Sequence, residues 1–421
     1  MEVHDLIGVG FGPSNLALAI ALHEQHHGQR APTVRFLEKS ANFTWHEHML
    51  LPDTRMQVAF LKDLVSLRNP KSHFSFINYL HEKGRLQAFI NLKTFYPSRH
   101  EFSDYLTWAA SHFDDRIDYG HEVITVTPVL QASAVKLLKV HTRDAQGQEQ
   151  FYLTRHLVLG VGGSTRIPEP FLPHQHDPRI FHSSRYLKHI AQHRHAQRIA
   201  VVGGGQSAAE IFMDLPNHLP NVPCDLIMRQ SALRVSDDSP FVNEIFDTQV
   251  VDYLYENPER NSAYLKDFRH TNYAAANLDL VERIYQFIYQ QHVNGVEGHR
   301  VLNDRTITAV ETSAQGVAIT SSDARSNSCS TQQYDMVILA TGYERDHHRE
   351  LLEPLASHLG DLRVDRQYRL HTPEDFHPSI FLQGACESSH GLSDTLLSIL
   401  AIRSAEISHA LTTRLHACEE H

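Results

Sequence analysis

Short apolar runs that end in glycine recur along the chain, and two of them head matching units. In the first unit, Asp5–Ala19 is typical of a buried strand, a tight glycine turn and a helix that begins at Pro13. In the second, Ile199–Glu210 repeats the apolar strand, the glycines and an amphipathic helix. Near-continuous apolar runs are typical of parallel strands with helices on both faces. The pattern predicts an α/β fold with two Rossmann-like units.

The rest of the pattern supplies the neighbours of these two units. Further apolar runs predict strands at 33–38, 157–163, 225–229, 335–343 and 380–384. Helices are expected at 74–83 and 101–112, and β alternation at 122–160, with a hairpin turn at 145–148, and near 310–320. Residues 390–398 are expected to open a long helix with Ser393 as its N-cap. Residues 231–300 are expected to be irregular to helical, with polar segments at 236–246 and 271–273 that line a site.

The glycines after the first strand leave room for a ligand. Gly8, Gly10 and Gly12 put no side chain between the backbone and an anion, and the helix from Pro13 points its free N–H groups at the turn. Because Pro13 replaces the last glycine of the usual pattern, a plain strand–turn–helix is also compatible with this turn. Glu38 ends the second strand, where an acid holds a ribose hydroxyl, although a surface glutamate would look the same. Turn and acid together predict a dinucleotide site.

The second glycine turn fits the dinucleotide pattern more closely. Gly203, Gly205 and Ala208 occupy the three positions of the motif, and the next strand ends in Arg229 rather than in an acid. An acid would repel a 2′-phosphate, whereas an arginine offers it two hydrogen bonds. This site is therefore predicted to prefer NADPH over NADH. The alternative is an ordinary surface arginine at a strand end.

Composition excludes several classes of protein. The 421 residues suffice for two or three domains, and 41% hydrophobic with 21% charged residues is typical of a globular chain. No apolar run reaches the length of about 20 residues that spans a bilayer. The first residues show no export signal, so a cytoplasmic protein is expected. A formal net charge of −11 argues against nucleic acid as a partner.

Cysteines and histidines give no sign of a metal or redox-disulfide site. The 32 histidines are scattered, without zinc-ligand spacing, so solvated or capping histidines are expected rather than ligands. The four cysteines, Cys224, Cys329, Cys386 and Cys418, are far apart in the sequence, which indicates reduced thiols. Two dinucleotide sites usually pair FAD with a nicotinamide. Without paired cysteines, the electron acceptors left open are a quinone, a metal complex or dioxygen.

Lys62 stands out because its neighbours are apolar. A lysine in such surroundings is costly unless it is paired or functional. It can supply the counter-charge for a substrate carboxylate, or form an ion pair with Asp63 or another acid.

Many short motifs, in order through most of the chain, resemble the flavin-dependent N-hydroxylating monooxygenases of siderophore biosynthesis, the lysine/ornithine N-monooxygenases. The motifs are Gly8-x-Gly10-x-Gly12-Pro13-x-Asn15, Trp45-His46, Met56-Gln57 with 60–64, Phe102-x-Asp104-Tyr105, 203–207, 238–244, 271–273, 340–343 and 390–398. His182-x-x-x-Tyr186 is similar to the broader flavin monooxygenase class. Each motif alone is weak, and their combination is specific.

The resemblance implies a role for each matching residue. FAD would contact Gly8, Gly10, Gly12, Pro13, Glu38, Trp45, His46, Met56, Gln57, Thr395, Leu396 and Leu397. NADPH would contact Gly203, Gly205, Gln206, Ser207, Arg229, Asn272 and Tyr273. The amino-acid substrate would contact Lys62, Asn243, Asn272 and Ser398. No side chain would act as a nucleophile. Arg99 would support the flavin or the substrate amine. The other residues that would support the reaction are Lys62, Gln57 and Asn272.

The implied reaction hydroxylates the side-chain amine of L-ornithine with dioxygen and NADPH, through a C(4a)-hydroperoxyflavin. Residues 238–244 resemble the ornithine branch of the family rather than the lysine branch. L-Lysine, a diamine and histamine remain alternative substrates, because one methylene contributes only about 1–3 kcal/mol of discrimination. A flavoprotein NADPH oxidase that has lost hydroxylation is the alternative of another class.

The implied fold has two Rossmann-like domains and a smaller, mostly helical substrate-binding region. Residues 1–168 and 336–421 are expected to form the FAD-binding domain. Residues 169–335 are expected to form the NADPH-binding domain, with the substrate-binding helices at about 236–296. By family precedent the protein would be a homo-oligomer, a tetramer, without a membrane segment.

Overall fold

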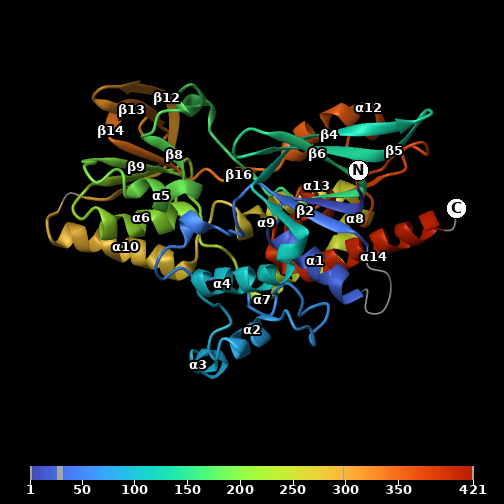
Figure 1. The fold of residues 1–421 in the computed structure, drawn as a ribbon. Coiled ribbons are helices and arrows are strands. Elements are labelled where there is room, and N and C mark those ends of the chain that lie inside the picture. Colours follow the sequence, from blue (N-terminus) through green and yellow to red (C-terminus); the bar gives the residue numbers. More distant parts are fainter. Residues whose placement is uncertain (1, 26–31, 297, 420–421) are drawn as a thin grey trace.

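Two sheets, a mixed one and a parallel one, each covered by helices, organise the molecule in the computed structural model, which describes residues 2–25, 32–296 and 298–419 (Figure 1). The first sheet has seven strands in the order β3-β2-β1-β6-β5-β4, with β17 beside β6. Its strands are β1 Val3–Val9, β2 Val34–Glu38, β3 Ile117–Tyr119, β4 His121–Gln131, β5 Ala134–Asp144, β6 Glu149–Leu159 and β17 Ser379–Leu382. We call this sheet and its helices the first unit.

The second sheet has five strands in the order β11-β10-β9-β15-β8, all parallel. Its strands are β8 Ile180–His182, β9 Ile199–Val202, β10 Cys224–Ile227, β11 Arg300–Leu302 and β15 Met336–Leu339. An antiparallel sheet covers one face; its strands are β12 Arg305–Ser313, β13 Gly316–Asp323 and β14 Ser328–Tyr334. We call these sheets and their helices the second unit, which is on the left in Figure 1.

The units join through β15, which corrects the predicted domain boundary at 335–336. β15 pairs with β9 and β8, so the chain leaves the second sheet only after Leu339. The sequence alone could not place this boundary, because 335–343 is a single apolar run. Only the pairing of β15 with β8 and β9 assigns the first half of that run to the second sheet. A short pair of strands, β7 Ser164–Thr165 and β16 Tyr343–Glu344, then bridges the two connections between the units.

The helices pack by their apolar faces against these sheets. In the first unit α1 Pro13–Gln25 lies against α14 Leu400–Glu419, and its residues from Asn15 to Leu22 are all buried. In the second unit α6 Gln206–His218 packs on the sheet and on α10 Leu278–Val293. The other helices are α2 Phe76–Glu82, α3 Leu86–Asn91, α4 Arg99–Ala110, α5 Tyr186–Ile190, α7 Pro240–Asn243, α8 Thr248–Glu256, α9 Pro258–Asn272, α11 His347–Leu351, α12 Ala356–Leu359 and α13 Glu387–His390.

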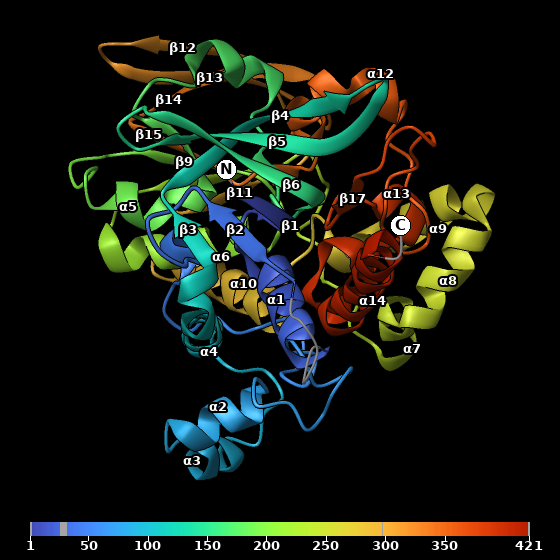
Figure 2. The same cartoon turned by 45° about the vertical axis from the view of Figure 1, so that its right-hand side comes forward.

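The helical insertion between β10 and β11 reaches back to the first unit. Helices α8 and α9 lie beside α13 and α14, at the right of Figure 2. Asn261 of α9 is buried and donates from Nδ2 to the backbone carbonyl of Glu387 over 3.2 Å. The insertion therefore borders both units, although its predicted role in substrate binding stays a prediction.

The local predictions for the first unit were confirmed except for the start of the long helix. The hairpin turn at 145–148 joins β5 to β6, with Gly147 at a φ of 81°. Strands and helices form at all the other predicted positions of the first unit. The long helix, however, begins at Leu400, after two 3₁₀ turns, η7 Leu392–Thr395 and η8 Leu397–Ile399. Ser393 lies inside η7 and is buried, so it does not cap that helix.

No helix within the described residues is long and apolar enough to cross a bilayer. Cys224, Cys329 and Cys386 are free thiols, and the side chain of Cys418 lies outside the described residues.

Candidate active site

The first glycine turn is shaped by backbone contacts that exclude side chains. Gly10 has a φ of +79°, a left-handed conformation that glycine adopts without strain, and its N–H donates to the carbonyl of Leu37 over 2.8 Å. A Cβ on Gly10 would lie 2.7 Å from the backbone oxygen of Gly160. A Cβ on Gly12, in contrast, would meet nothing within 4 Å. The turn is closed toward the sheet and open on its outer side, as a pyrophosphate cradle requires.

The side chain of Asn15 binds the backbone of this turn. Its side chain is fully buried and donates to the carbonyls of Val9, over 3.1 Å, and of Gly10, over 2.6 Å. Its Oδ1 accepts from Nε2 of Gln383 over 2.8 Å. These bonds account for the asparagine two residues after Pro13 and join the turn to the loop after β17.

Glu38 faces the same turn. Its Oε2 accepts from the backbone N–H of Phe11 over 2.7 Å, and Oε1 accepts from that of Ser40 over 2.8 Å. Each carboxylate oxygen has a second lone pair that can accept a ribose hydroxyl. The structure therefore brings the predicted ribose acid to the predicted pyrophosphate turn.

The second glycine turn has the same construction. Gly203 has a φ of +148°, and a Cβ there would lie 2.3 Å from the backbone oxygen of Ala340. Gly205 precedes α6, whose N-terminus, with Gln206 and Ser207, faces the turn. Arg229 comes two residues after β10 and is exposed. An anion at this turn would meet the helix N-terminus, and Arg229 is free to reach a 2′-phosphate.

Residues predicted for different ligands meet between the units. The Tyr273 hydroxyl donates to Oε2 of Glu387 over 2.6 Å and lies 3.2 Å from Oγ1 of Thr395. Burial, together with Glu387, raises the pKa of Tyr273 to about 12, so the hydroxyl keeps its proton. The structure thus brings Tyr273, predicted beside NADPH, to Thr395, predicted beside the flavin.

The turn that carries Thr395, Leu396 and Leu397 is anchored by a buried ion pair. Arg403 of α14 is 1% exposed and contacts Oδ1 of Asp394 at 2.9 Å. Its other terminal nitrogen donates to Oγ of Ser14 over 3.0 Å. The ion pair therefore fixes η7 relative to the N-terminal end of α1, at the first glycine turn.

Two of the predicted flavin residues, Trp45 and His46, lie in a cluster of aromatic rings. The Trp45 ring lies 5.7 Å from Phe102 and 4.7 Å from His46, measured between centroids. His46 has a φ of 52°, in the left-handed region, just before η1 Glu47–Met49. Met56 is buried, and its N–H donates to the carbonyl of Pro97 over 2.9 Å.

Lys62 is partly buried and does not pair with Asp63, so that alternative was wrong. The Asp63 carboxylate instead accepts from the backbone N–H groups of Val65, Ser66 and Phe76. Burial raises the pKa of Asp63, and these donors oppose the shift. Within the described ranges no acid lies at ion-pair distance from Lys62, so its ammonium group is available to a ligand carboxylate.

The other predicted substrate residues come from three separate segments. Asn243 ends α7 and donates to the carbonyl of Asp238 over 2.7 Å, Asn272 ends α9, and Ser398 is buried in η8. The 3₁₀ turn after Asn243 and helix α9 both pack against η7, next to η8. No hydrogen bond recorded for the described residues joins these side chains to one another.

Arg99 pairs with a carboxylate of the second unit, and its predicted support of the flavin or the substrate amine stays a prediction. Its guanidinium donates to both carboxylate oxygens of Glu210, each over 2.8 Å. Gln57 donates to Oδ1 of Asn277 over 3.2 Å. Neither Glu210 nor Asn277 is among the site residues predicted from the sequence; the only available signal was that Glu210 follows Gln206 by one helical turn.

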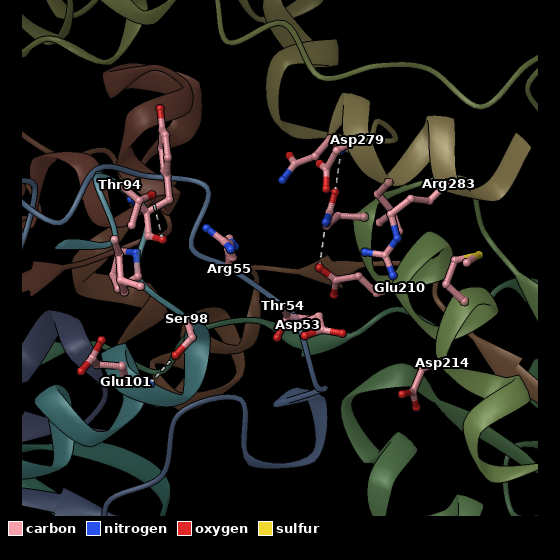
Figure 3. Close-up of a pocket in the computed structure, with 17 residues that line it drawn as sticks. Asp53, Thr54, Arg55, Thr94, Ser98, Glu101, Glu210, Asp214, Asp279 and Arg283 are labelled. Carbon is pink, nitrogen blue, oxygen red and sulfur yellow. Dashed lines mark hydrogen bonds between the residues drawn. The ribbon is translucent and has the colours of Figure 1, made fainter. Parts of the chain in front are cut away.

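A cavity of about 560 Å³ lies beside these bonds (Figure 3). Residues 53–55, 92, 94, 96–98 and 101 line it from the first unit, and residues of α6 and α10, with Asn277, line it from the second. Its lining is mainly acidic: Arg55 and Arg283 are the cations, and the acids are Asp53, Glu101, Glu210, Asp214 and Asp279. The cavity is thus a crevice between the two units.

Each of the two sheets carries a dinucleotide turn, and Tyr273 meets Thr395 between the two units. This arrangement is that of an enzyme with two nucleotide cofactors. A sequence model of the family "L-lysine 6-monooxygenase/L-ornithine 5-monooxygenase" matches residues 2–345. The chain belongs to this family.

Individual relatives match nearly the whole chain. The L-ornithine N(5)-monooxygenase of Pseudomonas aeruginosa is 50% identical over 419 residues, which cover 98% of this chain and 94% of that protein. The solved ornithine hydroxylase from Pseudomonas aeruginosa has a TM-score of 0.95 at 49% identity, covering 98% of this chain and 100% of that one. The ornithine N-hydroxylase of Kutzneria sp. 744, solved with reduced FAD, NADP+ and L-ornithine, has a TM-score of 0.92 at 36% identity, with coverages of 98% and 100%.

Proposed function

We propose that this protein is an FAD- and NADPH-dependent monooxygenase that converts L-ornithine to N(5)-hydroxy-L-ornithine for a hydroxamate siderophore. The observation that carries the proposal is the contact between Tyr273 and Thr395, which brings the two predicted cofactor sites to one point. The names of the most similar relatives and the reduced FAD, NADP+ and L-ornithine in the Kutzneria structure support it.

The first glycine turn would hold the FAD pyrophosphate, and Glu38 would hold its ribose. The turn at 395–397 and the side chain of Trp45 would contact the flavin ring system. The open space over Gly12 and the closed contact at Gly10 fit such a cofactor. Gln206, Ser207, Arg229, Asn272 and Tyr273 would hold NADPH. The flavin, when bound, supplies the chemistry of hydride acceptance and dioxygen activation; the protein contributes binding, orientation and exclusion of water.

Lys62 would bind the substrate carboxylate, because its ammonium group has no acid partner within the described part of the chain. Asn243, Asn272 and Ser398 would complete the site, since amides and hydroxyls both donate and accept. The reacting amine must be neutral to attack an electrophilic oxygen. With a pKa of about 10.4, on the order of 0.4% of a free alkyl amine is neutral at pH 8. A desolvated site lowers this pKa and raises the reactive fraction.

Purified protein supplied with FAD and NADPH tests the substrate. We expect hydroxylamine product from L-ornithine, with a higher kcat/KM than from L-lysine, putrescine or histamine. A preference for another amine would overturn ornithine as the substrate. Consumption of NADPH with only hydrogen peroxide formed, whichever amine is offered, would favour the oxidase. The proposal includes cytoplasmic activity and assembly into a homo-oligomer, and gel filtration with light scattering measures the assembly.

Replacing Arg229 by alanine is expected to raise the KM for NADPH by about 10-fold to 100-fold. A charge-assisted hydrogen bond contributes about 1.5–3 kcal/mol, and 1.4 kcal/mol is tenfold in affinity. NADH has no 2′-phosphate, so its KM is the internal control and should stay within about twofold. Steady-state oxidation of both nucleotides measures the ratio. An equal effect on both would remove Arg229 from the 2′-phosphate site.

A further inference from the structure

The carboxylate of Glu210 connects the two units. It projects from α6 of the second unit, and its side chain is 5% exposed. Both of its oxygens accept from Arg99 of α4, in the first unit, over 2.8 Å each. Oε1 also accepts from Nε2 of Gln206 over 2.7 Å. The carboxylate thus accepts two hydrogen bonds from a charged guanidinium and one from a neutral amide, and these three bonds hold it in one orientation.

The same network continues to the far side of the crevice. Oε1 of Gln206 accepts from the backbone N–H of Asn277 over 2.9 Å, and Oδ1 of Asn277 accepts from Gln57 over 3.2 Å. Both ends of the Gln206 amide are therefore engaged, one by Glu210 and one by Asn277. The chain of bonds begins and ends in the first unit, at Arg99 and Gln57, and passes through the second.

The network borders the crevice, and beside it Met49 and Leu51 of the first unit are buried against the core of the second unit. Thr54, Arg55 and Ser98 line that cavity from the first unit, and Glu210 and Met213 line it from the second. At the edge of this cavity of about 560 Å³, the ion pair between Arg99 and Glu210 joins the two units by direct hydrogen bonds.

We propose that Glu210 is a positioning residue for hydride transfer, holding Gln206 and the NADPH turn at a set distance from the flavin side of the molecule. This inference rests on the cofactor sites of the proposed function. Gln206 belongs to the predicted NADPH site and Gln57 to the predicted flavin site, so a shift at Glu210 changes the approach of one cofactor to the other. Positioning errors of about 1 Å can cost about 100-fold in rate.

Glu210→Gln tests the proposal, because it keeps the shape and removes the charge that holds Arg99. We expect the rate constant for anaerobic flavin reduction at saturating NADPH to fall by about 10-fold to 100-fold. The fraction of NADPH that ends as hydrogen peroxide in the presence of L-ornithine should rise. The KM for NADPH should stay within about threefold, and FAD content should equal that of the wild type. Glu210→Asp, which keeps the charge, should recover part of the rate.

Asp177→Asn is the matched control. Asp177 forms a comparable pair with Arg179, at 2.7 Å, within the second unit. This variant should be reduced at the wild-type rate. Wild-type reduction and peroxide formation for Glu210→Gln would overturn the proposal, as would a lower melting temperature with unchanged kinetics. If Glu210→Gln does not fold, the same measurements on Glu210→Asp decide. Failure of the wild type to hydroxylate any amine would instead contradict the proposed function, since flavin reduction is measured without an amine.

Discussion

Lys62→Ala is expected to raise the KM for L-ornithine by about 100-fold while the purified enzyme keeps its FAD. Removing one partner of a desolvated charge pair costs about 2–5 kcal/mol, and each 1.4 kcal/mol is tenfold. Asp63 already accepts four hydrogen bonds from its own neighbourhood, so Lys62 has no role in satisfying it. The binding free energy lost in Lys62→Ala is therefore that of the contact with the substrate carboxylate.

Steady-state kinetics with varied L-ornithine, and flavin absorbance per protein, measure both halves of this prediction. Lys71→Ala is the matched control, because Lys71 is an exposed lysine in the same segment. Its KM should equal that of the wild type. An unchanged KM in Lys62→Ala would remove Lys62 from the substrate site, and a loss of FAD would make it a flavin residue instead.

The second large effect is expected from Gly10→Ala, which should abolish stable FAD binding. The new Cβ would lie 2.7 Å from the Gly160 backbone oxygen, and a φ of +79° costs an alanine about 1–2 kcal/mol. The glycine turn must shift, and with it the N–H groups that would face the pyrophosphate. We expect the FAD dissociation constant to rise at least 100-fold, which titration of apoprotein with FAD measures.

Gly147→Ala separates the backbone strain from the site. Gly147 has a φ of +81°, and a Cβ there meets nothing within 4 Å. It belongs to the β5–β6 hairpin, so this variant should lose the stability that the positive φ costs, without the clash at Gly160, and should keep FAD. Equal FAD loss in both variants would mean that global destabilisation, and not the turn, explains the effect.

Local patterns were sufficient for the framework of the fold. Buried strands such as β9 and β15 are uninterrupted apolar runs in the sequence. The two turns are visible as glycines, because a side chain at Gly10 or Gly203 would clash with the backbone. Helix α3 and strand β14 were not predicted. They lack a clean apolar period: in α3 only Phe89 is buried, and most of β14 is exposed.

The errors share a cause, because each depends on partners distant in sequence. Ser393 looks like a helix cap, but the pair of Asp394 and Arg403 holds its turn in the interior. The domain boundary was wrong because strand pairing, and not composition, assigns β15. Glu210 was missed because Arg99, its partner, lies 111 residues away. The predicted ligand roles of the site residues remain predictions, which the variants above test.

Hydroxylation itself is tested most directly by one measurement: the reaction of the wild-type enzyme with FAD, NADPH, L-ornithine and ¹⁸O₂, followed by mass spectrometry. We expect one ¹⁸O atom in the product, on the side-chain nitrogen, with roughly one NADPH oxidised per product formed, as for a flavin monooxygenase. Unlabelled L-ornithine recovered intact, with hydrogen peroxide equal to the NADPH consumed, would contradict it.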